Sequence, residues 1–162
     1  MHTENPADSA VETRLAELDI ALPAVAPPVA SYVPAVVTGN LVYTSGQLPF
    51  IDGKLPATGK VGAPGGVDAE TATQLAATCA VNALAAIKDR IGNLDRVTRI
   101  VKVVGFVASD PSFTGQPGVI NGASDLFAAA LGEAGIHARS AVGVAVLPLD
   151  SAVEVEVIAE FA

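Results

Sequence analysis

The order of strand-like and helix-like segments limits this chain to few architectures. Two short strands are predicted at 33–37 and 41–45, a helix at about 68–91, a strand at 97–107, a helix at about 116–132, and two closing strands at about 140–147 and 153–161. The resulting order, ββ-α-β-α-ββ, indicates an α+β fold in which one mixed sheet carries both long helices on the same face. The other face of such a sheet needs a separate cover.

The longer segments carry clear periodic signals. Asp68 is a good N-cap for the first long helix, whose apolar stripe of Ala76, Ala80, Leu84 and Ile87 recurs at intervals of three or four residues. The β-branched run 97–107 is typical of a central strand. In the last segment, valines alternate with glutamates, which predicts a strand with one buried face.

The chain length of 162 residues fits one domain, which we place at 9–162. Residues 1–8 are expected to be disordered. Ser9 and Glu12 have the spacing of a capping box, which predicts a short N-terminal helix ending near Leu18.

Hydrophobic residues make up 51% of the chain and charged residues only 16%. For a domain of this size, such an excess predicts that apolar surface is covered between subunits, so we expect an oligomer. The alternative is that small alanines inflate the count without forming a patch.

The formal net charge is −8, and lysines and arginines are scattered. Nucleic-acid binding relies on clustered cations, so the composition disfavours DNA, RNA and anionic membranes as partners. The sequence shows no signal-peptide pattern and no apolar run of the ~20 residues that span a bilayer, which predicts a cytoplasmic protein.

Residues that often bind metals or cofactors are sparse. Cys79 is the only cysteine, so it forms no internal disulfide, and it is interpreted as a small buried hydrophobe rather than a nucleophile. His2 and His137 lack the partner spacing of a metal site. The glycine-rich segment 59–66 does not match a phosphate-binding loop, because Lys60 is followed by valine. The residues therefore predict neither a metal site nor a nucleotide site at this loop.

Arg139 and Glu154 are the strongest candidates for a functional site. Arg139 opens a strand without other charges, and Glu154 is the first glutamate of the final strand. A guanidinium binds a carboxylate through two parallel hydrogen bonds. We expect the two strands to be neighbours, so that Arg139 holds a small carboxylate and Glu154 positions a water beside it. Alternatively, Arg139 forms a surface ion pair and Glu154 belongs to a solvated strand face.

Several short motifs, taken together, make the chain resemble a known family. They are Tyr32-Val33-Pro34, the run from Gly39 to Pro49, Val101-Lys102-Val103, Asn121, Ala138-Arg139-Ser140, Leu147-Pro148, and Val153-Glu154-Val155-Glu156. In this order they resemble the RidA family, also called YjgF. The resemblance implies a chorismate-mutase-like α+β fold that assembles as a homotrimer, with ligand clefts between subunits.

The resemblance also implies an activity, namely hydrolysis of reactive 2-imino acids or their enamine tautomers to 2-keto acids and ammonia without a cofactor. Arg139 would hold the substrate carboxylate with help from the Ala141 backbone amide, and Glu154 would orient or deprotonate water. Ser45 and Gly46 would shape the cleft, which Tyr32 and Asn121 would line.

The chain departs from the compact family members in a way that suggests a divergent branch. Its N-terminal segment is longer. It also carries the divergent run His137-Ala138-Arg139-Ser140-Ala141-Val142-Gly143, in which His137 stands where many members carry proline and Gly143 replaces a common glutamate.

Two other functions remain open. The same cleft would serve a regulatory trimer that binds a small ligand without turnover. Some relatives are described as endoribonucleases or translation inhibitors, a function that the acidic charge and the missing His/Lys cluster disfavour.

Overall fold

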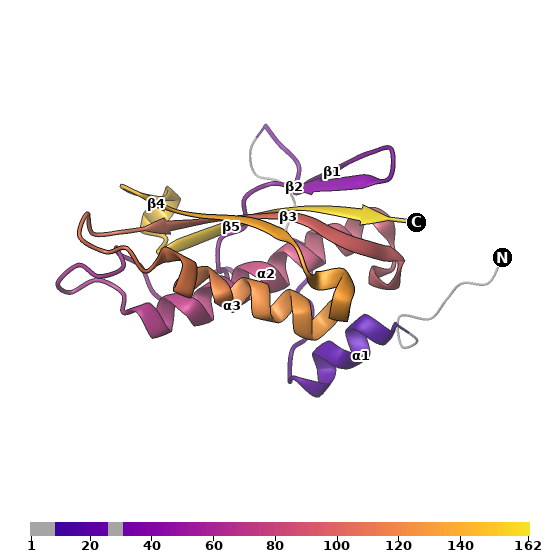
Figure 1. The fold of residues 1–162 in the computed structure, drawn as a ribbon, viewed down its shortest axis with the longest axis horizontal. Coiled ribbons are helices and arrows are strands. Elements are labelled where there is room, and N and C mark those ends of the chain that lie inside the picture. The colour runs from indigo at the N-terminus through magenta and orange to yellow at the C-terminus, as the bar shows by residue number, and fades with distance from the viewer. Residues whose placement is uncertain (1–8, 26–30) are drawn as a thin grey trace.

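In the computed structural model, residues 9–25 and 31–162 are described, so the predicted disorder of residues 1–8 lies outside them. Within these residues, five strands form one mixed sheet (Figure 1). They are β1 (Ala35–Thr38), β2 (Leu41–Thr44), β3 (Val97–Ala108), β4 (Ala138–Val144) and β5 (Val153–Phe161), in the order β1-β2-β5-β3-β4. Only the β3–β4 pair is parallel among these neighbours. The α+β prediction is confirmed.

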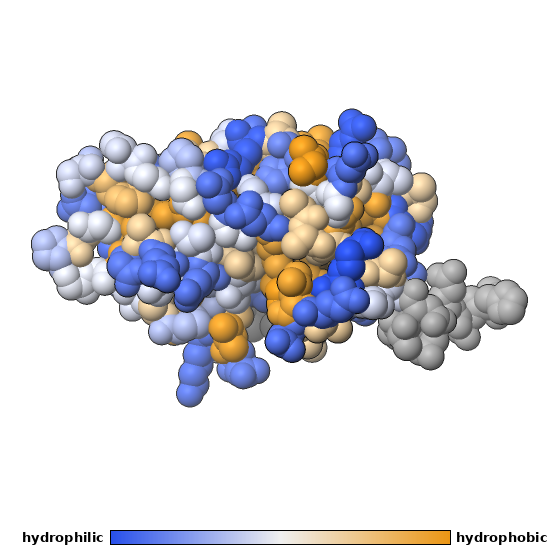
Figure 2. All heavy atoms as spheres, turned by 60° about the horizontal axis from the view of Figure 1, so that its bottom comes forward, coloured by the Kyte–Doolittle hydropathy of each residue, from blue (hydrophilic) through white to orange (hydrophobic). Residues whose placement is uncertain are grey.

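Helices α2 (Ala69–Ile91) and α3 (Gln116–Leu131) both lie on one side of the sheet, as predicted (Figure 1). The buried residues of β5, Val153, Val155, Val157 and Ala159, face these helices and form the centre of the core. Alanines on α2 let the helix approach the sheet closely. On this helix side, apolar and polar residues are interspersed at the surface (Figure 2).

The expectation that the last two strands are neighbours is wrong. β3 lies between β4 and β5, because β4 returns through α3 as the parallel neighbour of β3. That crossover takes one edge of β3 and leaves the other for β5. The fourth strand also ends earlier than predicted, at Val144, and Val146 beyond it is 66% exposed.

The opposite side of the sheet carries no α-helix among the described elements, and we call it the open face (Figure 1). It presents Tyr43, Lys102, Val104, Phe106, Val142, Glu154, Glu156 and Ile158. Tyr43 and Val142 are each 42% exposed, so this face mixes charged groups with a substantial apolar area.

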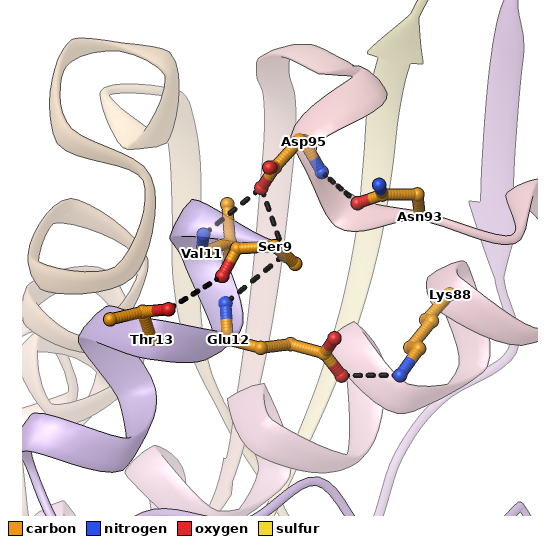
Figure 3. Close-up of polar contacts among 7 residues, drawn as sticks. All are labelled: Ser9, Val11, Glu12, Thr13, Lys88, Asn93 and Asp95. Atoms are coloured by element: carbon orange, nitrogen blue, oxygen red, sulfur yellow. Dashed lines mark hydrogen bonds and ion pairs between the residues drawn. The ribbon is translucent and has the colours of Figure 1, made fainter. Parts of the chain in front are cut away.

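The short helix α1 (Ala10–Glu17) packs against the rest of the chain through a polar cluster (Figure 3). The Asp95 carboxylate accepts hydrogen bonds from the Ser9 hydroxyl at 2.9 Å and from the amides of Ala10 and Val11 at 2.8 and 3.0 Å. Ser9 also accepts from the Glu12 amide, as the capping box predicts, but the Glu12 side chain pairs with Lys88 instead of capping. Asp95 thus supplies the second half of the cap.

Candidate functional site

Arg139 lies on the helix side of the sheet. It is opposite Val103 in the parallel register, and Val103 is fully buried beneath the helices. The next residue, Ser140, is on the open face, where its hydroxyl accepts from Lys102 at 3.0 Å. Since side chains alternate along a strand, the Arg139 side chain must turn toward α3.

Three neutral acceptors on α3 hold the guanidinium. Nη1 donates to Asn121 Oδ1 at 2.7 Å and to Ser124 Oγ at 3.2 Å, and Nη2 donates to the Pro117 carbonyl at 3.3 Å. Within residues 9–25 and 31–162, no carboxylate lies within ion-pair distance of Arg139, and Nε donates to none of these residues. The half-buried cation therefore has no carboxylate partner among the described residues, and its Nε–H is left for an anion.

Glu154 lies on the open face, opposite Phe106 of β3. Its carboxylate sits directly over Gly46, where an added Cβ would lie only 1.8 Å from Oε1. Burial raises the pKa of Glu154, and the nearby Glu156 charge raises it further. A carboxylate with a raised pKa is a stronger base than an ordinary surface glutamate.

A bulge between β2 and β5 brings Gly46 to this position. Tyr43 pairs with Ile158, and Gln47 pairs with Val155. The chain advances four residues from Tyr43 to Gln47 but only three from Ile158 back to Val155, so the first segment holds one extra residue. Thr44 stabilises the bulge by accepting from the Val157 amide at 3.0 Å through its hydroxyl. The extra residue interrupts the pairing with β5 at Ser45 and Gly46, while the Ser45 amide still donates to the Pro34 carbonyl at 2.8 Å.

The residues predicted to form one site are divided between two places on the chain. Arg139, Asn121 and Ala141 lie where β4 meets α3, and we call this group the arginine half-site. Ala141 is two residues after Arg139 on the edge strand, where alternate backbone amides point away from the sheet.

Glu154, Ser45 and Gly46 form the glutamate half-site on the open face. The Ser45 hydroxyl donates to the Val33 carbonyl at 2.7 Å, which links this half-site to the segment that carries Tyr32. Tyr32 itself is 61% exposed. Because the half-sites lie on opposite sides of the sheet, the expectation that Arg139 and Glu154 meet across adjacent strands of one chain is wrong.

Two polar residues of the arginine half-site were not predicted as parts of it. Ser124 bonds Arg139 and also lies 2.9 Å from His137 Nε2. Ser124 follows Asn121 by three residues, a spacing that places both on one helix face, and this signal is readable in the sequence. Gln116 fills the space above Gly143, with its amide nitrogen 2.7 Å from where a Cβ would be.

The described residues contain no cluster of three or more histidine, cysteine, aspartate or glutamate side chains that could hold a metal ion. The Cys79 thiol is fully buried, and burial raises its pKa well above the ordinary value, with the Glu154 charge as a further cause. Its thiolate form is therefore disfavoured. None of the described helices has the length and apolar character needed to cross a bilayer.

Comparison with known protein families identifies the family of the chain. The family model described as "YjgF/chorismate_mutase-like, putative endoribonuclease" matches residues 12–161. The chain belongs to the YjgF/RidA family. The predicted chorismate-mutase-like fold is thereby confirmed, and the family match spans nearly all of the chain.

Relatives of this YjgF/RidA protein differ in how much of the chain they cover. Protein TCP17 of Trypanosoma cruzi is 46% identical over 156 residues, 95% of this chain and 96% of its own length. The crystal structure of Atu1372 from Agrobacterium tumefaciens, described as of unknown function, has a TM-score of 0.88 at 48% identity and covers 94% of both chains. RidA from an Antarctic Psychrobacter has a TM-score of 0.56 at 30% identity, covering 83% of this chain and 92% of its own.

Proposed function

We propose that this YjgF/RidA protein hydrolyses 2-imino acids and their enamine tautomers to 2-keto acids and ammonia. The observation that carries the proposal is the Arg139 guanidinium, which α3 holds through neutral acceptors while no described carboxylate neutralises it. A half-buried cation with an unused Nε–H favours a small organic acid. The start of α3 adds a favourable positive dipole on the same side, near Pro117.

In this reaction the protein mainly has to orient the substrate and the attacking water. With the carboxylate bound to Arg139, the protonated imine carbon is already electrophilic. Water adds to that carbon and one of its protons passes to Glu154, which gives a neutral carbinolamine. Glu154 returns the proton to the amino group, the C–N bond breaks to release ammonia, and the hydroxyl proton passes to Glu154 as the carbonyl forms. The raised pKa of Glu154 suits it to accept this proton and return it to the leaving nitrogen.

The two half-sites act together in this proposal when they come from two copies of the chain. Arg139 lies at the edge strand β4 and Glu154 on the open face, so the surfaces that meet are different on the two partners. Contacts between two different surfaces form a closed ring when the rotation between neighbouring copies closes. We propose a ring of three copies, a homotrimer. The exposed apolar residues of the open face, including Val142 and Tyr43, support its burial between subunits.

The test is release of ammonia and keto acid from 2-iminobutyrate generated in situ, compared with spontaneous hydrolysis. The wild-type protein should exceed the blank, and Arg139→Ala should return to it. Arg139→Lys should retain only a small part of the activity, because an ammonium lacks the planar fork. Binding of a keto acid without any rate above the blank would instead support the regulatory alternative.

A mass measurement in solution tests the assembly separately. A monomeric protein with full activity would contradict the proposed sharing of Arg139 and Glu154 between copies. Glu154→Gln should keep the trimer and the ligand affinity but lose turnover.

A further inference from the structure

We propose that His137 and Ser124 position the Arg139 guanidinium for its carboxylate ligand, an inference that rests on the proposed function. These two residues form a chain of hydrogen bonds that runs from the backbone at Gly135 to Arg139. His137 Nδ1 lies 2.6 Å from the Gly135 carbonyl, His137 Nε2 lies 2.9 Å from Ser124 Oγ, and Ser124 Oγ lies 3.2 Å from Arg139 Nη1.

The direction of each hydrogen bond follows from the chemistry of the groups. A carbonyl oxygen only accepts, so His137 must carry a proton on Nδ1. In the neutral ring, Nε2 is then an acceptor, and the Ser124 hydroxyl donates its proton to it. The lone pairs of the Ser124 oxygen are left for the guanidinium, which only donates.

One further contact fixes the position of His137. Its ring packs edge-on against Phe127, with centroids 5.9 Å apart and planes at 85°. Phe127 is fully buried in the core beneath the sheet. The imidazole is thus a rigid support that ties the arginine half-site to the core.

Without His137, the Ser124 hydroxyl has a competing partner. A serine inside a helix readily donates to the carbonyl four residues earlier, here that of Ile120. A hydroxyl turned that way no longer has the same lone pairs directed at Arg139. Arg139 would then depend on Asn121, which is exposed, and on the more distant Pro117 carbonyl. His137 and Ser124 are therefore positioning residues, since in this arrangement neither bonds the ligand.

The direct test of the network is the tautomer of His137 in the full-length protein. Two-dimensional ¹H–¹⁵N NMR of the imidazole should show the neutral form protonated on Nδ1, which is the less common tautomer of free histidine. Protonation on Nε2 alone would overturn the inference, because that nitrogen could not accept from Ser124.

The functional test is the affinity for 2-ketobutyrate, measured by calorimetry, together with kcat and KM for the imine. Ser124→Ala and His137→Phe should weaken binding about three- to tenfold, the loss expected for one hydrogen bond, and should raise KM more than they lower kcat. Ser124→Thr retains the hydroxyl and should restore affinity. His137→Phe keeps the ring contact with Phe127, so its fold should be maintained.

Thr78→Ala is the matched control, since it removes a helical hydroxyl that bonds only its own helix, at the Gln74 carbonyl. It should bind like the wild type. If the wild type binds and Arg139→Ala does not, yet Ser124→Ala and His137→Phe bind normally, the positioning role is overturned while the proposed site stands. A wild-type protein that binds no keto acid, or an Arg139→Ala variant that binds equally well, would overturn the proposed function itself and the inference with it.

Discussion

The backbone of Gly46 lies directly against the Glu154 carboxylate, at a distance that leaves no room for even a methyl group. A Cβ on Gly46 would lie 1.8 Å from Oε1 and 2.7 Å from the carboxyl carbon. The φ angle of Gly46 is not in the left-handed region, so this position requires glycine for space rather than for backbone conformation. The bulge at Ser45 and Gly46 thus sets where the carboxylate lies.

Gly46→Ala should therefore reduce activity without unfolding the protein. The displaced group is the end of a flexible side chain, so we expect the free energy of unfolding to change by less than about 1 kcal/mol. Turnover should fall on the order of 100-fold, as expected when a reacting group shifts by about 1 Å. Steady-state kinetics and a denaturant titration measure both quantities. A folded variant with wild-type kcat would show that the Glu154 position is unimportant for catalysis.

Glu154→Gln should make the protein more stable at neutral pH. Burial and the Glu156 charge raise the pKa of Glu154 in the folded state above its value in the unfolded chain, about 4.3. The folded state therefore binds its proton more tightly, and this contribution to stability is present below pH ~4 and lost as the pH rises through the folded pKa. Glutamine stays uncharged at every pH, so the variant does not lose this contribution to stability as the pH rises.

Melting temperatures at pH 4 and pH 7.5 check this prediction. The two proteins should melt alike at pH 4, whereas the variant should melt higher at pH 7.5. Glu133→Gln, at an exposed position, is the matched control for the removal of a surface carboxylate. A variant that is less stable at pH 7.5 would mean that the carboxylate is favourably paired in the assembled protein.

The fold class was predictable because periodicity reports which face of an element is buried. The valines of β5 and the apolar stripe of α2 identify their inward faces directly. A period of two says nothing about which strand lies beside which, and so the sequence wrongly suggested that β4 and β5 are neighbours. Only the crossover through α3 determines that β3 separates them.

The candidate residues were identified individually, but their grouping was not predictable from the sequence. Arg139 and Glu154 face opposite sides of the sheet, a relation that depends on the register of each with β3. The contact of Gly46 with Glu154 depends on a bulge that no local sequence pattern predicts. Ser124, by contrast, could be inferred from its spacing to Asn121.

Asp95→Asn should loosen α1 from the body of the protein. Burial alone would raise the pKa of Asp95, but hydrogen bonds from the Val11 and Ala10 amides and from Ser9 outweigh it and lower that pKa. Asparagine keeps one acceptor oxygen and loses the charge, so we expect a cost of about 1 kcal/mol, typical of a helix cap. Asp89→Asn, which loses only a surface pair with Arg90 at 3.7 Å, should cost almost nothing.

Hydrogen exchange measures the loosening of α1 directly. The amides of the helix should exchange faster in Asp95→Asn while those of β5 keep their protection. The wild type should show the same change as the pH falls below about 4, because protonating a carboxyl with a lowered pKa removes its contribution. Unchanged exchange in α1 would mean that the apolar contacts of Val11 and Leu15 hold the helix unaided.

Gly122→Ala and Gly118→Ala form a matched pair on α3 with opposite expected effects. A Cβ on Gly122 would lie 1.9 Å from the Thr73 carbonyl oxygen, which belongs to the backbone of α2 and has no rotamer to change. The helices would have to separate, which costs about 1–3 kcal/mol, the usual range for overpacking. A Cβ on Gly118 meets nothing within 4 Å, so alanine there should stabilise the helix by about 0.5–1 kcal/mol.

Chemical denaturation gives the free energy of unfolding of both variants. A loss at Gly122 and a gain at Gly118 would show that close packing requires the first glycine, whereas the second only lowers helix propensity. Because α3 also carries Asn121 and Ser124, movement of the helix away from α2 should alter the arginine half-site as well. Gly122→Ala should therefore bind 2-ketobutyrate more weakly than Gly118→Ala even where both are fully folded. Equal stability of the two variants would show that α2 and α3 can adjust their separation freely, and that the close contact at Gly122 does not determine where α3 holds Arg139.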